Sequence, residues 1–580
     1  MTSASFRVQV VVDLLKKHHV KNIVFSPGSR NAPLVIGFNG DNYFKTKVLV
    51  DERSAAFVAL GMAQQLNEPV VICSTSGSAV LNYSPAIVEA FYQKIPLIVI
   101  TADRPPEWVD HGEGQSMRQY KVYENFIAES YNLPMLDHPD ALWQTGVMTN
   151  EAFHVSKILS KPVHVNFPFR EPLYKTELKP SQTGKKITHF ETKKSISKEQ
   201  LKSLQKKWVK HNKKMIVCGS LQNSSSLNNI LIELNKDPSV CILTETTSNL
   251  YHENFISCID RTLERINDNP KFYPEIVITV GNSIISKKLK KLLRKNKPNE
   301  HWHVEEANRA QDIFSSLTHF IPIEPEDFFK DFLDGYQFNK DSNFSKNWSL
   351  EFEKSDDNHL HYLSLSKWSD LKAHYLIQKQ LYGKKVNLQM GNSTSVRYVQ
   401  LFQQQKDLKY NSNRGVSGID GSSSTAVGAA SITDELTVLI TGDLSFIYDQ
   451  HALWNKEVPK NLKIIVVNNQ GGGIFNIISG PKTTPYSKDF FETRHEISLE
   501  KIAATFRINY QKASNEAQAT ECLNNIFKSS SNFFQTYFVC SFKKILTVGS
   551  SFRTRNNIKY TATLIIYNYN FKIFWNFFIP

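Results

Sequence analysis

The chain reads LTVLITGD over residues 436–443 and LKIIVVNNQGGG over residues 462–473, and these two stretches decide its fold. Each is a short apolar run that ends in turn-forming residues, as buried strands do. The interval between them suits a helix. Continuous apolar strands that alternate with helices predict a parallel sheet covered on both faces.

The same rhythm occurs earlier in the chain. Lys-rich or polar stretches at 178–214 and 339–358 separate three sets of expected strands: Asn22–Phe25, Lys47–Val50, Val70–Cys73, Leu97–Thr101 and Val163–Phe167; Met215–Cys218, Cys241–Thr244, Glu275–Val280 and His301–Val304; and Val386–Met390 with the two quoted above. We therefore predict an α/β fold of three doubly wound parallel-sheet domains in series. The expected bounds are 1–180, 181–350 and 351–545, followed by an atypical basic, aromatic tail at 546–580.

The basic charge is unevenly distributed along the 580 residues. Lys and Arg exceed Asp and Glu by 14, but half of that excess follows Glu521, after which no acidic residue occurs. This distribution weakens the case for nucleic acid, and we expect no such partner. Six scattered cysteines without a CxxC pair favour a reducing compartment, and we expect a cytoplasmic protein. Because no run of 18 apolar residues occurs, we expect no stable membrane insertion.

Polar residues follow both quoted strands. Asp443 and Asn469 stand at strand ends and offer hard oxygen ligands, and Gly471 begins a glycine run that lets the backbone approach closely. Mg²⁺ held by few protein oxygens usually completes its octahedron with phosphate oxygens and water. The pattern therefore predicts a metal site that anchors a diphosphate, with Asp443, Asn469 and Gly471 as ligands. Either motif alone is an ordinary turn signal.

This pair of motifs resembles the signature of thiamine-diphosphate enzymes. Those enzymes have a pyrimidine-binding domain, often a middle domain, and a diphosphate-binding domain, and they require a glutamate after a strand of the first domain. Glu52, in Val50-Asp51-Glu52-Arg53, matches that position. The resemblance implies thiamine diphosphate and Mg²⁺ (or Mn²⁺) as cofactors, with Glu52 as the group that shares a proton with the cofactor.

Further motifs narrow the resemblance to the carboligases of menaquinone biosynthesis. They are, in order, SPGSR at 26–30, DER at 51–53, STSGSA at 74–79, TADRPPE at 101–107, GNS at 391–393, NRGVSGIDG at 413–421 and NNQGGGIF at 468–475. The match extends to about Asn532. It implies decarboxylation of 2-oxoglutarate and addition of the succinyl-semialdehyde carbanion to isochorismate. It also implies a homodimer or homotetramer, with each site between the first domain of one subunit and the third of another.

The resemblance assigns roles residue by residue. Both substrates are dicarboxylates, and Arg binds carboxylates in a bidentate manner. The implied catalytic residues are Glu52, Arg30 and Gln115; those that bind the cofactor are Glu52, Ser393, Ile419, Asp443, Asn469, Gly471, Ile474 and Phe475; and those that bind substrate are Ser29, Arg30, Arg104, Gln115, Lys287, Lys288, Arg397 and Arg414. Gly114 departs from the family, because some relatives carry a side-chain amide there.

Several alternatives stay open at this stage. Ile419, Ile474 and Phe475 are also suited to core packing, and Lys287 and Lys288 to a solvated helix face. The chain could be another thiamine-diphosphate 2-oxoacid decarboxylase or carboligase, or a binding protein inactivated by a damaged C-terminus. The tail from Leu546 onward departs from the family, which suggests an altered reading frame; a membrane-contact segment is the rival reading.

Overall fold

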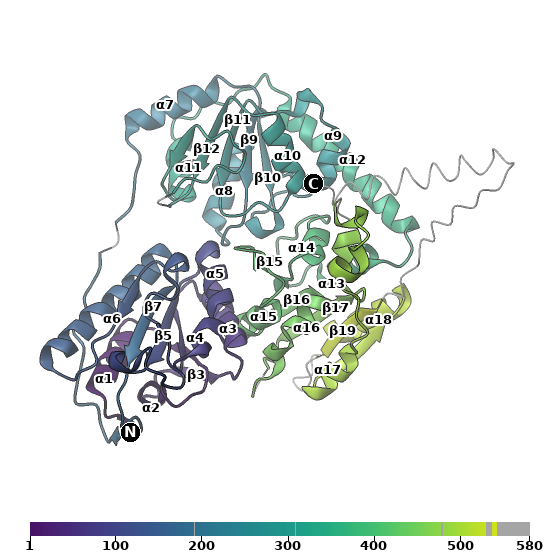
Figure 1. Cartoon of the computed structure of the whole chain (residues 1–580). Coiled ribbons are helices and arrows are strands. Elements are labelled where there is room, and N and C mark those ends of the chain that lie inside the picture. The colour runs from purple at the N-terminus through teal and green to yellow at the C-terminus, as the bar shows by residue number, and fades with distance from the viewer. Residues whose placement is uncertain (191, 308, 457, 477–479, 529–535, 542–580) are drawn as a thin grey trace.

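The computed structural model describes residues 1–190, 192–307, 309–456, 458–476, 480–528 and 536–541. Three parallel sheets follow one another along this part of the chain, and Figure 1 shows them as three lobes. The predicted α/β class is confirmed. The expected tail at 546–580 lies outside the described residues.

The first sheet has six parallel strands in the order β3-β2-β4-β5-β7-β6. Helices α1 (Phe6–Lys17), α2 (Ala32–Asn39) and α6 (Pro139–Leu159) cover one face, and α3 (Glu52–Leu66) and α5 (Ser84–Gln93) cover the other. The strands are β2 (Asn22–Phe25), β3 (Lys45–Val48), β4 (Val70–Ser74), β5 (Leu97–Asp103), β6 (Ser130–Asn132) and β7 (Val163–Pro168).

The second sheet has five parallel strands in the order β10-β9-β11-β12-β13. Helix α7 (Lys198–Val209) precedes it, and α9 (Ile259–Ile266) and α10 (Lys287–Lys295) lie on one side of it. Its strands are β9 (Lys214–Cys218), β10 (Val240–Thr244), β11 (Ile276–Val280), β12 (Glu300–Val304) and β13 (His319–Ile321).

The third sheet has six parallel strands in the order β15-β14-β16-β17-β19-β18. Helices α13 (Asp370–Leu381) and α18 (Glu516–Lys528) lie on one face, and α15 (Ser422–Ala430) lies on the other. Its strands are β14 (Val386–Met390), β15 (Leu408–Ser412), β16 (Leu436–Gly442), β17 (Leu462–Asn468), β18 (Asn509–Ala513) and β19 (Thr536–Ser541).

Two details differ from the strand predictions. The second strand is Lys45–Val48 rather than Lys47–Val50, because Val50 lies in the turn that leads into α3. Strands β6, β13, β15, β18 and β19 were not predicted, nor was the antiparallel pair of β1 (Thr2–Ser3) and β8 (Thr176–Glu177); apart from β19, these strands are two to five residues long and carry polar residues. Whether such a segment forms a strand depends on pairing with a neighbouring strand more than on its own residues.

Helix α12 (Phe344–Leu365) links the second and third sheets. Its first half buries Trp348 and Phe352 in the core of the second sheet, and Leu363 near its end packs with Tyr398 of the third. One continuous helix therefore crosses the expected boundary at 350/351, and the domain bounds stay a prediction.

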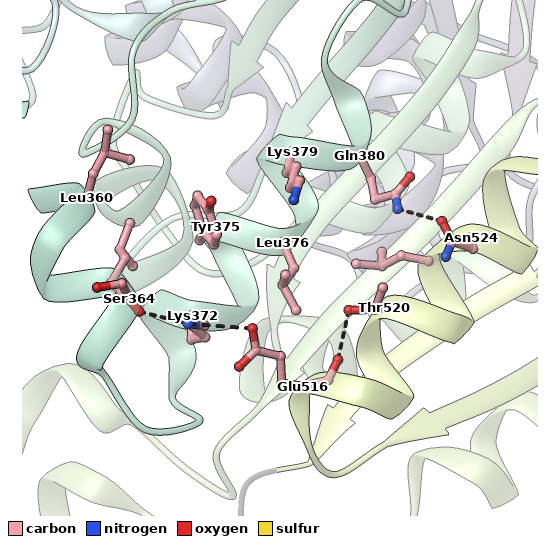
Figure 2. A pocket seen from close by; sticks show the side chains of 12 residues that line it. Leu360, Ser364, Lys372, Tyr375, Leu376, Lys379, Gln380, Glu516, Thr520 and Asn524 are labelled. Carbon is pink, nitrogen blue, oxygen red and sulfur yellow. Dashed lines mark hydrogen bonds and ion pairs between the residues drawn. The ribbon is translucent and has the colours of Figure 1, made fainter.

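A cavity of about 510 Å³ lies between α12, α13 and α18 (Figure 2). Within it, Lys372 Nζ donates to the Leu363 carbonyl at 2.7 Å and lies 3.5 Å from the Glu516 carboxylate. Gln380 Nε2 also donates to Asn524 Oδ1 at 2.7 Å. These polar contacts hold α13 against its neighbours, which matters because α13 begins beside Asn469.

Helix α3 of the first sheet packs directly on α15 of the third. A Cβ atom added at Gly61 would lie 2.0 Å from the Thr425 carbonyl oxygen, and one at Gly428 would lie 2.0 Å from that of Val58. Ser54 Oγ and Ser424 Oγ are 2.8 Å apart between the same helices. The two backbones therefore touch, and only glycine fits at both positions.

We expect Gly428→Val to lower the free energy of unfolding by about 3 kcal/mol, because the new side chain overlaps the backbone of α3. Urea unfolding of the purified protein measures this change. Gly146→Ala on α6 is the control, since its nearest neighbours are side-chain atoms at 3.8 and 3.9 Å and Ala favours a helix. Equal unfolding midpoints for the two variants would contradict the assigned role of the contact.

Candidate active site

Asp443 lies at the carboxyl end of β16, where it begins the short helix α16 (Asp443–Tyr448). Asn469 directly follows β17, which is hydrogen-bonded to β16, so both residues stand at strand ends as predicted, and the two strands are neighbours. The Asp443 carboxylate accepts the backbone N–H groups of Leu444 at 2.7 Å and Gly471 at 3.0 Å. His495 Nε2 lies 3.3 Å from the same carboxylate.

Asn469 is held through its amide nitrogen. Asn469 Nδ2 donates to Asp370 Oδ2 at 2.9 Å, at the first residue of α13. Asn469 Oδ1 is buried and has no hydrogen-bond partner among the described residues. A buried oxygen left without a partner is costly. Its carbonyl chemistry suits a hard cation, so the residues present fit the metal that the sequence predicts.

Burial sets the ionisation of this cluster. It raises the pKa of Asp443 and raises the pKa of Asp370 to about 6, and the charge of Asp443 adds to the effect on Asp370. A nearby divalent cation favours the ionised form of both carboxyl groups. Within the described ranges, no group of three or more His, Cys, Asp or Glu side chains is placed to hold a metal. The protein thus offers few ligands, which is the arrangement that Mg²⁺ shares with phosphates and water.

The glycine run after Asn469 lets the backbone approach closely. A Cβ atom at Gly471, where φ is +151°, would lie 2.6 Å from the Glu492 carbonyl oxygen, and one at Gly473 would lie 2.6 Å from Asn469 Nδ2. Gly472 N–H donates to the Glu492 carbonyl at 2.6 Å. Segments 469–473 and 492–495 therefore enclose the Asp443 carboxylate together.

The three predicted apolar cofactor contacts lie in loops or short turns of the third sheet. Ile419 is 41% exposed, so it is not a core residue. Ile474 and Phe475 are partly buried in a short 3₁₀ turn, Gly473–Asn476, where the Phe475 ring lies 5.8 Å from that of Phe491. Ser393 precedes α14 (Thr394–Val399) with a φ of +71°.

Glu52 is the first residue of α3 and is partly exposed. Asn82 Nδ2 donates to its carboxylate at 3.3 Å. Its neighbours bind the third sheet's elements: Asp51 pairs with His451, and Arg53 donates to the Tyr448 carbonyl at 2.7 Å. In the described part of this chain, no hydrogen bond or ion pair joins Glu52 to Asp443 or Asn469.

Arg30 and Arg104, the first arginine group, meet at the carboxyl ends of the first sheet. Arg30 is 3% exposed and donates to the Phe169 carbonyl at 3.2 Å, and burial and then Arg104 lower its pKa. Arg104 Nη2 donates to the Gly114 carbonyl at 2.9 Å, so Gly114 contributes a backbone oxygen. Gln115 follows in the left-handed conformation and is exposed, as is Ser29.

Arg397 and Arg414, the second arginine group, lie between the second and third sheets. Arg414 Nη1 donates to Asn392 Oδ1 at 3.1 Å, and Arg397 donates to the Ser393 carbonyl. Burial, and after it the charge of Arg397, lowers the pKa of Arg414 to about 10. Lys287 and Lys288 begin α10 nearby; Lys287 is exposed and Lys288 pairs with Glu264. Between the described residues, no hydrogen bond or ion pair connects the two arginine groups.

The structure adds residues that the sequence did not reveal. Asp370 contacts Asn469, 99 residues away in the sequence, and His495 contacts Asp443, 52 residues away. No sequence motif includes either Asp370 or His495. Lys290, Asp260 and Glu245 surround the second arginine group. Only tertiary contact identifies these residues, because each stands outside the strand-end motifs.

Two family models match the chain: the thiamine pyrophosphate enzyme N-terminal TPP binding domain over residues 7–122 and the C-terminal TPP binding domain over residues 390–534. These matches include Glu52 in the first region and Asp443, Asn469 and Gly471 in the second. The fold and the matches define a thiamine pyrophosphate enzyme of the α/β class.

Curated relatives define the family more narrowly. The chain is 41% identical over 529 residues to the 2-succinyl-5-enolpyruvyl-6-hydroxy-3-cyclohexene-1-carboxylate (SEPHCHC) synthase of Flavobacterium johnsoniae, covering 90% of this chain and 94% of the relative. It is 42% identical to that of Flavobacterium psychrophilum, covering 89% and 92%, and 36% identical to that of Porphyromonas gingivalis, covering 90% and 92%. The chain belongs to the SEPHCHC synthase family.

We expect Asp443→Asn to weaken Mg²⁺-dependent binding of thiamine diphosphate at least ten-fold, because the cation loses its anionic ligand. Titration of the cofactor at fixed Mg²⁺, followed by tryptophan fluorescence, measures the affinity. Asp434→Asn, an exposed residue before the opposite end of β16, is the control. Similar affinities in both variants would exclude Asp443 as a ligand.

Proposed function

We propose that this chain decarboxylates 2-oxoglutarate on thiamine diphosphate and joins the remaining four-carbon unit to isochorismate, giving SEPHCHC and CO₂ in menaquinone biosynthesis. The observation that carries the proposal is the 41% identity to a SEPHCHC synthase across 90% of the chain. The strand-end cluster at Asp443 and the two arginine groups support it, because a diphosphate cofactor and two dicarboxylates need such sites.

The third sheet supplies the cofactor site in this proposal. Asp443 Oδ2, Asn469 Oδ1 and the Gly471 backbone would hold Mg²⁺ (or Mn²⁺), which in turn binds the diphosphate. When bound, thiamine diphosphate accepts the electrons that the departing carboxylate leaves behind. Ile419 is exposed and suited to contact the cofactor rings, and Ile474 and Phe475 are suited to form an apolar wall beside them.

The first sheet supplies the proton-holding group. Glu52 lies at the amino end of α3, directly after the N-cap residue Asp51. Its carboxyl group would share a proton with the ring nitrogen of the aminopyrimidine. Because Asp51 and Arg53 on either side bind the elements at 448–451, the Glu52 backbone is fixed in place.

The arginine groups would bind the substrate carboxylates. Arg30 and Arg104, with Ser29 and Gln115 beside them, form one anion-binding end; Arg397 and Arg414, with Lys287 and Lys288, form the other. Arg30, Arg104 and Arg414 each have a buried Nε without a partner among the described residues, so each retains a donor for a carboxylate. The catalytic assignment of Arg30 and Gln115 is part of this proposal.

We also propose a homodimer or homotetramer in the cytoplasm. Within one chain, no described contact joins Glu52 to the metal-binding cluster, and a second copy would bring a partner's Glu52 to it. No helix in the described ranges has the length and apolarity needed to span a bilayer.

The direct test is turnover by the purified full-length chain with thiamine diphosphate, Mg²⁺, 2-oxoglutarate and isochorismate, followed by loss of isochorismate. We expect turnover with 2-oxoglutarate and none with pyruvate in its place. Turnover with pyruvate alone would favour another 2-oxoacid decarboxylase. Cofactor binding without any turnover would favour an inactive binding protein.

We expect Glu52→Gln to lower kcat by a factor of at least about 100, the usual size of a proton-transfer contribution. The reason is that an amide cannot share the proton that the cofactor requires. Glu68→Gln, just beyond the other end of α3 where Glu68 pairs with Lys157, is the control and should keep normal kcat. A Glu52→Gln enzyme with unchanged kcat would refute the role of Glu52.

A further inference from the structure

Glu245 is a fully buried carboxylate directly after strand β10 of the second sheet. Its Oε2 accepts the backbone N–H of Ile285 at 2.7 Å, and its Oε1 accepts that of Ser286 at 2.8 Å. Both oxygens are therefore used to fix the turn that follows β11. Burying an ionised carboxylate costs free energy unless it is hydrogen-bonded or paired with a charge, and these two N–H donors lower that cost.

That turn sets the start of helix α10. Ser286 is the N-cap of α10, its Oγ accepting the Leu289 N–H at 3.0 Å and donating to the Asp260 carboxylate. Lys287 and Lys288 follow at once as the first two residues of the helix. Glu245 therefore determines where the predicted substrate-binding lysines stand.

Glu245 also faces the second arginine group from the opposite sheet. Burial lowers the pKa of Arg397, Arg414 and Lys290; the charge of Glu245 opposes that lowering at all three, and Asp260 opposes it at Arg397. A second link fixes the same junction, because Gln404 Nε2 of the third domain donates to the Glu245 carbonyl at 2.7 Å and Thr244 Oγ1 donates to Gln404 Oε1 at 3.2 Å.

Charge balance explains why a carboxylate occupies this position. Arg397, Arg414 and Lys290 bring three positive charges into one partly buried region, and Arg397 and Arg414 repel each other. Without Glu245, Asp260 would still act on Arg397, but Arg414 and Lys290 would lose the favourable charge that Glu245 supplies. The cations would then move apart toward solvent, and a dicarboxylate would meet a less ordered site.

We propose that Glu245 is a positioning residue for substrate binding: from the second sheet it holds Lys287 and Lys288 through the start of α10 and orders Arg397 and Arg414 of the third. The inference rests on the proposed function, because it takes these four cations as substrate-binding. It gives the middle domain a part in the reaction site without requiring that any of its acids touch the substrate.

The test compares Glu245→Gln with wild type in steady-state kinetics. Gln places an amide N–H₂ against one of the two backbone N–H donors and removes the charge, so we expect at least a ten-fold rise in KM for 2-oxoglutarate or isochorismate. We expect kcat to change less than three-fold and thiamine diphosphate affinity to stay as in wild type. KM values for both substrates within two-fold of wild type would overturn the inference, as would a large loss of kcat alone.

A matched control separates positioning from stability. Glu305 is 6% exposed, lies at the same end of the same sheet after β12, and pairs at 2.6 Å with Lys94, the residue that ends α5. Glu305→Gln should lower the unfolding midpoint as Glu245→Gln does but leave both KM values unchanged. If Glu245→Gln does not fold, Glu245→Asp, which keeps the charge, should show a smaller rise in KM; wild-type KM values in that variant would also overturn the inference.

The pH profile gives an independent readout. Burial raises the pKa of Glu245 to about 7, Asp260 adding to the rise while the N–H groups of Ser286 and Ile285 and the charge of Arg414 oppose it. The other charged groups around this junction include Arg397, Lys290, Lys287, Lys288 and Arg294 and, from α5, the buried Glu89.

Since the carboxylate is lost as pH falls through about 7, wild-type KM should rise between pH 8 and pH 6. Glu245→Gln should lack that rise, and the same rise in the variant would overturn the inference. Absence of turnover in the wild-type chain would instead refute the proposed function.

Discussion

The contact between α3 and α15 is the constraint that fixes the first and third sheets against each other within one chain. Gly61 and Gly428 let the two helix backbones touch, so no side chain sets their separation. Helix α3 begins with Glu52, and α15 follows the loop that carries Arg414 and Ile419. Fixing this one contact therefore fixes Glu52 relative to the loop at 413–421 of the same chain.

Polar contacts extend that constraint to all three sheets. The buried carboxylate of Glu89 on α5 accepts the N–H groups of Gly415 at 2.6 Å and Val416 at 2.8 Å, directly after Arg414. Glu245 faces Arg414 from the second sheet. Asn392 of the third sheet accepts a hydrogen bond from the Arg414 guanidinium. Glu89 from the first domain and Glu245 from the second therefore both contact or face the loop that carries Arg414. The position of Arg414 thus depends on how these two domains are placed against the third.

The parts of the site that the sequence predicts are those at the ends of its own strands. Asp443 and Asn469 were predictable because adjacent parallel strands bring their carboxyl ends together. Glu52 needed the family resemblance, since a Glu at a helix start is common for reasons of helix dipole alone. Asp370, His495 and Glu245 could not be predicted, because only packing brings them to the site from distant elements. The short strands were missed for the same reason, as their partners define them.

Burial also explains why arginine suits the proposed substrate-binding positions of the third sheet. The environment of Arg414 lowers its pKa to about 10, which leaves the guanidinium fully charged at neutral pH. A lysine has an ordinary pKa of about 10.4, and the same burial would lower it toward the neutral range, so that more of the charge is lost. A planar guanidinium also offers two parallel N–H donors to a carboxylate, which an ammonium group does not.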